Sequence, residues 1–256
     1  MRRDVLEMRA FYASPLGAAA RTMISRKVNE VWGEAAGLDV LVLGYGTPFV
    51  DALSTRARRV VAAMPAEQGV EAWPVGQPNR ACLADETDLP FSAALFDRVL
   101  AIHALEESDN PLRVLCEAGR VLAPSGRLVV AVAARHGLWA NSENTPFGHG
   151  RPYSRRQLEA LIREADLEPT GWTRALYAPP IASVARFAEA FEQAGAWLWR
   201  PFAGVTLIEA VKQVYATTPR ATRVKARVFA PGVFNPVPAG RTPTDQRRSA
   251  KVLERR

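Results

Sequence analysis

Short apolar runs alternate along the chain with longer segments whose apolar side chains recur every three or four positions. The runs predict buried strands, and the recurrences predict helices that bury one face. The predicted strands cover residues 38–43, 59–63, 79–84, 97–102, 127–134, 172–177 and 206–216. The predicted helices cover residues 1–32 with a break at Pro15-Leu16-Gly17, and then 50–58, 111–122, 154–165 and 181–194. The alternation predicts an α/β fold with a doubly wound sheet of seven strands, the last of them antiparallel.

The distribution of charge divides the chain into three predicted parts. Residues 1–36 form an N-terminal helical extension, residues 37–217 the α/β domain, and residues 218–256 a flexible basic tail. Residues 220–256 carry ten Lys and Arg against two acidic residues, a net charge of +8, so the rest of the chain is −1 in a total of +7. A near-neutral body is not typical of a groove that follows phosphates. The tail is either solvated or binds an anionic partner such as RNA or an acidic protein.

Composition sets the broad class of protein. At 256 residues and 48% hydrophobic content the chain can bury a sizeable core, which excludes disorder as its overall state. Its longest apolar runs, such as residues 128–134, are far shorter than a membrane span, and no secretory signal opens the chain. Cys82 and Cys116 lie in apolar runs and are expected to be buried thiols. We therefore expect a soluble, cytoplasmic protein without membrane insertion.

Three segments of the chain resemble the type 11 methyltransferases, which are class I enzymes dependent on S-adenosylmethionine. They are Ala84-Asp85-Glu86-Thr87-Asp88-Leu89-Pro90-Phe91 with the following residues 95–100, then residues 115–128, and then His149-Gly150-Arg151-Pro152-Tyr153-Ser154. The resemblance covers about residues 38–170. It implies a Rossmann-like methyltransferase domain, S-adenosylmethionine as cofactor, and direct methyl transfer to an unidentified acceptor, which we expect to be a small molecule.

The resemblance also implies the residues of a cofactor site. In doubly wound sheets ligands bind beyond the carboxyl ends of the strands, where these positions are expected to lie. The glycines of the first loop would meet the methionine and ribose parts, Asp85 would accept the adenine amino group, and the end of the fourth strand would face the sulfonium. The implied cofactor-binding residues are Gly44, Tyr45, Gly46, Met64, Asp85, Glu86, Ala101 and His103.

Three positions of this site depart from the family pattern. Val42 stands where the family has an acidic residue, and Pro48 stands where it has a third glycine. Met64 stands at the end of the second strand, where the family has the carboxylate that binds both ribose hydroxyls. Either Glu67 or a backbone group replaces that carboxylate, or the fold has lost its cofactor.

Candidate catalytic residues are His103, His149 and Tyr153, and candidate substrate-binding residues are Arg151 and Tyr153. His103 could act as a base on the acceptor side, and it could equally be a helix-start residue that bonds to the backbone. The other three lie in a loop rich in glycine, proline and aromatic residues, a composition that shapes pockets or docks the next helix. The histidines lack i, i+4 pairing and neither cysteine has a C-x-x-C partner, so no metal site is expected.

Two alternatives to a small-molecule methyltransferase remain open from the sequence. The first is a non-catalytic binding or scaffold protein with a degenerate cofactor site, which Met64 favours. The second is an RNA methyltransferase that uses the basic tail for phosphate contacts. Deletion of the tail would separate the second from the others, because an RNA enzyme would lose affinity and its steep dependence on salt.

Overall fold

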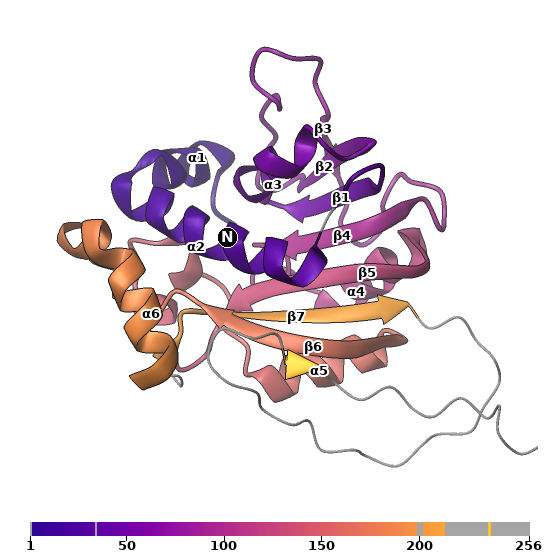
Figure 1. Ribbon diagram of the computed structural model, residues 1–256. Helices are drawn as coiled ribbons and strands as arrows, with labels where there is room; N and C mark the ends of the chain where they lie inside the picture. The colour runs from indigo at the N-terminus through magenta and orange to yellow at the C-terminus, as the bar shows by residue number, and fades with distance from the viewer. Residues whose placement is uncertain (1, 34, 199–201, 213–234, 237–256) are drawn as a thin grey trace, which may run out of the picture.

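The computed structural model describes residues 2–33, 35–198, 202–212 and 235–236, and they form a mixed sheet covered on both faces by helices (Figure 1). The strands lie in the order β3-β2-β1-β4-β5-β7-β6-β8. Their bounds are β1 Asp39–Gly44, β2 Arg59–Pro65, β3 Ala81–Ala84, β4 Phe96–Ile102, β5 Leu122–Ala133, β6 Leu167–Ala175, β7 Val205–Lys212 and β8 Asn235–Pro236. β1 to β5 pair in parallel, and β7 runs antiparallel to both β5 and β6. The predicted doubly wound sheet with an antiparallel last long strand is confirmed.

Alternate residues of the central strands supply two separate cores. In β1, Val40 and Val42 face the core that is shared with the N-terminal helices, whereas Leu41 and Leu43 face the core on the opposite side. Figure 1 shows α1, α2 and α6 on the first side and α4 and α5 on the second. The helices are α1 Val5–Ala13, α2 Pro15–Trp32, α3 Thr47–Ser54, α4 Pro111–Val121, α5 Arg155–Glu164 and α6 Ala188–Leu198. Short 3₁₀ turns are η1 Leu138–Asn141, η2 Pro146–Gly148 and η3 Ala182–Phe187.

The first two helices pack on the sheet as part of its core. Asp4 caps α1 by accepting a hydrogen bond from the backbone of Leu6, and Ser14 separates α1 from α2, as the predicted break requires. α1 buries Val5, Met8 and Tyr12 on one face and leaves Leu6 56% exposed. These three buried side chains belong to the same core as Val40 and Val42 of β1. The N-terminal residues therefore cover the sheet directly.

Several boundaries differ from the prediction for local reasons. α3 begins at Thr47 because Pro48 fits the first turn of a helix, where no backbone N–H is needed. The helix predicted for residues 181–194 is a 3₁₀ turn followed by α6. The last four residues of the strand predicted for 206–216 lie outside the described residues. So does the tail, apart from the two residues of β8, which pair with β6. Among the described residues, no helix combines the length and the apolar content needed to cross a membrane.

Candidate functional site

The strand order reverses between β1 and β4, so the loops that follow these two strands meet at the carboxyl edge of the sheet, and we call this place the crevice. Ligands of doubly wound sheets bind at this place. Gly44 ends β1 beside Ile102 of β4, with a φ of +80°. A Cβ atom on Gly44 would lie 2.3 Å from the carbonyl oxygen of Ile102. The crevice therefore requires glycine at this position, both for its backbone conformation and for its packing.

The loop after β1 contacts the segment that follows β2. Tyr45 is only 2% exposed, and its hydroxyl donates a 2.7 Å hydrogen bond to Oε1 of Glu71. Gly46 is the N-cap of α3. Met64, at the end of β2, is fully buried in the core, and the carboxylate of Glu67 is exposed. The carboxylate that contacts the glycine loop is that of Glu71, which the sequence interpretation missed.

The loop after β3 presents two further carboxylates. Oδ1 of Asp85 accepts hydrogen bonds from the backbone N–H and the hydroxyl of Thr87, which hold the pKa of this exposed carboxyl below its usual value. The adjacent Glu86 is half-buried and binds Arg2, whose Nη2 lies 2.6 Å from Oε1 and whose Nη1 contacts Oε2. Both residues follow β3 directly, and their contact with the adenine of a cofactor stays a prediction.

His103 follows β4 in the left-handed region, with a φ of +52°. A non-glycine residue held in this conformation is a feature that concentrates at functional sites. Its Nε2 and the hydroxyl oxygen of Tyr12 lie 2.6 Å apart and share a hydrogen bond, and its ring lies 4.7 Å from that of Phe147. Burial, with a smaller contribution from Arg3, lowers the pKa of His103 to about 3. The imidazole is therefore neutral at physiological pH. Ala101, two residues earlier, belongs to the core on the opposite side of the sheet.

Glu106 is a buried carboxyl beside the crevice that the sequence interpretation also missed. Its Oε1 accepts a 2.9 Å hydrogen bond from the backbone N–H of Ala133, at the end of β5, whereas its buried Oε2 has no hydrogen-bond partner. Burial raises the pKa of Glu106 to about 7. A carboxyl group with this pKa exchanges a proton readily near neutral pH.

The loop after β5 brings the other sequence candidates to the same edge of the sheet. The hydroxyl of Tyr153 donates to the carbonyl of Leu105 over 3.2 Å, and the backbone N–H of Arg151 donates to the carbonyl of Glu106 over 2.7 Å. The residue Arg151 is itself exposed. His149 accepts a hydrogen bond from Arg3 Nη2 over 2.6 Å. His103, His149 and Tyr153 thus lie around one group of loops, with Glu106 among them.

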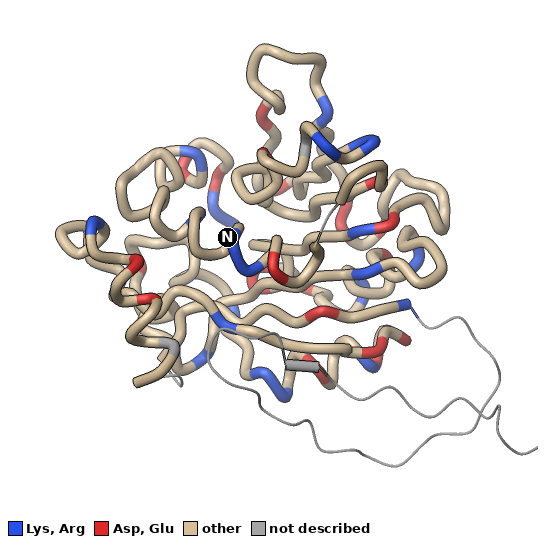
Figure 2. Tube along the Cα trace, viewed as in Figure 1, with Lys and Arg blue, Asp and Glu red and all other residues tan. Residues whose placement is uncertain are grey.

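Residues 2–12 cross all of these loops, and we call them the N-terminal strap. Figure 2 shows the basic start of the chain lying across the edge of the sheet. Besides Arg2 on Glu86, the backbone N–H of Arg3 donates to Glu107 over 3.1 Å, and Arg9 lies 3.7 Å from the carboxylate of Glu71. Each contact joins a donor of the strap to an acceptor of the crevice.

The polar groups of the crevice fit a nucleoside. The carboxylates of Glu71, Asp85 and Glu86 can accept hydrogen bonds from hydroxyl and amino groups. The loops after β2 and β4 also carry buried polar atoms without a hydrogen-bond partner, namely Oε1 of Gln68 and Oε2 of Glu106. Such atoms are costly unless a ligand or water pairs with them. In the described part of the chain, no group of three or more His, Cys, Asp or Glu side chains is arranged to hold a metal ion.

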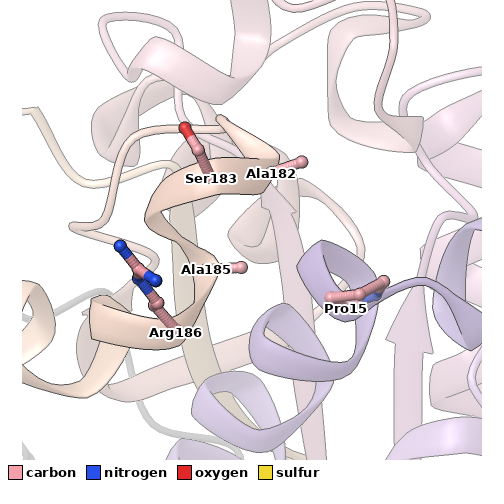
Figure 3. Close-up of a pocket in the computed structure, with 5 residues that line it drawn as sticks. All are labelled: Pro15, Ala182, Ser183, Ala185 and Arg186. Carbon is pink, nitrogen blue, oxygen red and sulfur yellow. The ribbon is translucent and has the colours of Figure 1, made fainter.

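A separate pocket of about 440 Å³ lies between η3 and the start of α2 (Figure 3). Its lining residues are Pro15, Ala182, Ser183, Ala185 and Arg186. None of them contacts the crevice loops through an interaction described above, so we treat this pocket as distinct from the candidate site.

Residues 41–130 match the sequence profile of a family described as a methyltransferase domain. The match extends from β1 into β5 and includes the loops that carry Gly44, Glu71, Asp85 and His103. This part of the chain is similar to a methyltransferase domain. The crevice described above is formed mainly by loops of the matched segment, and the N-terminal strap precedes it.

Known proteins support the domain and its fold. The 27-O-demethylrifamycin SV methyltransferase of Amycolatopsis mediterranei (strain S699) is 37% identical over 93 residues, which are 34% of this chain and 34% of that protein. The chain therefore matches about a third of the length of this curated relative. A SAM-dependent methyltransferase structure from Thermotoga maritima has a TM-score of 0.58 at 19% identity, covering 82% of this chain and 96% of that chain. The structure of the [4+2]-cyclase SpnF has a TM-score of 0.54 at 20% identity, covering 75% and 80%. The Rossmann-like methyltransferase fold is confirmed.

Proposed function

We propose that the protein transfers a methyl group from S-adenosylmethionine to a small-molecule acceptor. The observation that carries the proposal is that the part of the chain matching a methyltransferase domain supplies the glycine loop and the carboxylates around the switch-point crevice. The curated relative bears the name of a methyltransferase acting on a rifamycin, a small molecule, which favours an acceptor of that class. SpnF, a [4+2]-cyclase, shares the fold, so the fold alone does not decide the reaction. The reaction has to be argued from the residues of the site.

The residues proposed to hold the cofactor come from three loops. Backbone groups at Gly44–Gly46 would contact its methionine and ribose, and Asp85 would accept its adenine amino group. Glu71 would accept the ribose hydroxyls, in place of the carboxylate that is absent at Met64. When bound, S-adenosylmethionine supplies an electrophilic methyl group.

Transfer to a hydroxyl or amine releases a proton, and we assign its acceptance to Glu106. With a pKa of about 3, His103 is a weak base, whereas the Glu106 carboxyl has a pKa of about 7 and an oxygen that is free of hydrogen bonds. His103 and Tyr12 would then form a neutral hydrogen-bonded wall of the site. Tyr153 and Phe147 border the same loops and would contact the acceptor.

Calorimetric titration with S-adenosylhomocysteine tests the cofactor site. We expect wild-type protein to bind, and we expect Asp85→Ala and Glu71→Gln each to weaken binding about tenfold or more, because each removes hydrogen bonds to a charged group. Asp109→Ala is the matched control, since Asp109 is an exposed carboxylate in the loop before α4. Equal affinity in all four proteins would refute the assignment of Asp85 and Glu71. Absence of binding would leave the alternative of a non-catalytic protein with this fold, which the buried Met64 favours.

A further inference from the structure

The acceptor groups around the crevice are already bonded to the protein's own N-terminus. Glu86 binds Arg2, Glu107 binds Arg2 and Arg3, and Glu71 lies beside Arg9. The side chain of Arg2 is only 3% exposed, although it carries a charge. A cation buried in this way is held in place by its partner carboxylates.

The same contacts place the strap in the path of a ligand. Val5 donates its backbone N–H to the carbonyl of Gln68 over 2.8 Å, so the strap also binds the loop after β2. Tyr12 stacks on Tyr45, in the loop after β1, with ring centroids 5.9 Å apart. Its hydroxyl shares a hydrogen bond with His103, so the strap also contacts the loop after β4. The strap thus binds the loops after β1, β2, β3 and β4.

The two ends of the strap are held differently. At its C-terminal end, Gly17 of α2 packs so closely on α1 that an added Cβ would lie 2.0 Å from the carbonyl oxygen of Phe11. At the other end, residues 2–4 are held by ion pairs of Arg2 and hydrogen bonds of Arg3, which a ligand with amino and hydroxyl groups can replace, and the core begins only at Val5. Movement is therefore easiest at the end that carries Arg2.

We propose that the N-terminal strap is a gate, which opens from its Arg2 end to admit the nucleoside part of the cofactor beneath residues 2–4. In the closed form, Arg2 binds Glu86, and donor groups of the strap pair with the acceptors that the ligand would bind. Binding then requires the open form, and the observed association rate is the intrinsic rate multiplied by the fraction of open molecules. This inference rests on the proposed function.

Stopped-flow mixing with S-adenosylhomocysteine tests the gate. Trp139 is a suitable fluorescent reporter, because its ring lies 5.6 Å from Phe147, which contacts His103. We expect Arg2→Ala to raise the association rate constant about tenfold, and Glu86→Gln to raise it in the same direction, because both weaken one charged pair. Arg21→Ala is the matched control, since Arg21 is an exposed arginine on α2; it should associate at the wild-type rate.

Hydrogen exchange gives a readout that needs no ligand. The amide of Val5 should exchange faster in Arg2→Ala than in wild-type protein, whereas the amides at the C-terminal end of α1 should change less. Faster exchange at Val5 with an unchanged association rate would overturn the gate and leave the proposed function standing. Binding that is detected for Arg2→Ala but for none of the other three proteins would support a gate that stays closed in the wild-type protein. Absence of binding in all four proteins would refute the proposed function, and the gate with it.

Discussion

Replacement of Gly44 by alanine is expected to lower the free energy of unfolding by about 3 kcal/mol or more. Two costs add at this position. An L-residue at a φ of +80° costs roughly 1–2 kcal/mol, and the added methyl group would lie 2.3 Å from the carbonyl oxygen of Ile102 and 2.9 Å from that of His103, which costs about 1–3 kcal/mol of overpacking. Both contacts are with backbone, so no side chain can rotate to relieve them.

Urea denaturation followed by circular dichroism measures this loss, and Gly37→Ala is the matched control. Gly37 has a φ of +72°, and an added Cβ would meet nothing within 4 Å. Its replacement should therefore carry only the backbone cost of about 1–2 kcal/mol. Equal losses for the two variants would show that the close approach of β1 and β4 does not constrain the crevice.

Replacement of Glu106 by glutamine is expected to make the protein about 3 kcal/mol more stable at pH 8 while leaving its stability near pH 4.5 almost unchanged. Burial raises the pKa of this carboxyl from 4.5 to about 7, so between these values the folded state binds the proton and the unfolded state releases it. Stability therefore falls as the pH rises through this window, by about 1.4 kcal/mol for each unit of the shift. Glutamine keeps an oxygen to accept from Ala133 and carries no charge.

The difference in unfolding free energy between wild type and Glu106→Gln, measured by urea denaturation from pH 4.5 to 8, isolates this group. His103 acts in the opposite sense, because its pKa of about 3 lies below the usual 6.5 and stability is lost as the pH falls below 6.5. That contribution is present in both proteins and cancels. Glu164→Gln on the exposed side of α5 is the control for replacing a glutamate by glutamine. A constant difference for Glu106→Gln would mean that its carboxyl titrates normally.

The fold could be predicted because its signals are local. The run at residues 38–43 is apolar except for Asp39, since β1 is covered on both faces, and Pro15 itself marks the break between the first two helices. The position of His103 at the carboxyl edge also follows from the strand pattern alone. α1 shows the limit of such reasoning, because its apolar residues include Leu6, which the fold leaves exposed.

Most of the contacts within the site could not be predicted, because they join residues that are far apart in the chain. Arg2 and Glu86 are separated by 84 positions, and Tyr12 and His103 by 91. Glu71 lies seven residues beyond Met64, so the carboxylate beside the glycine loop comes from the segment between β2 and β3 rather than from the end of β2. A charged residue such as Glu106 after a strand is ordinarily solvated, and only its packing shows that it is buried.

The two outermost strands have a consequence for the behaviour of the protein at high concentration. β3 has four residues, and β8 has two, one of which is Pro236. A sheet edge recruits strands from other molecules when it is long and carries free backbone N–H groups, and proline has none. Within the described residues, the margin at β3 is therefore too short to act as a template for intermolecular β-pairing, whereas at the other margin β8 covers only Gly171 and Trp172 of the nine residues of β6.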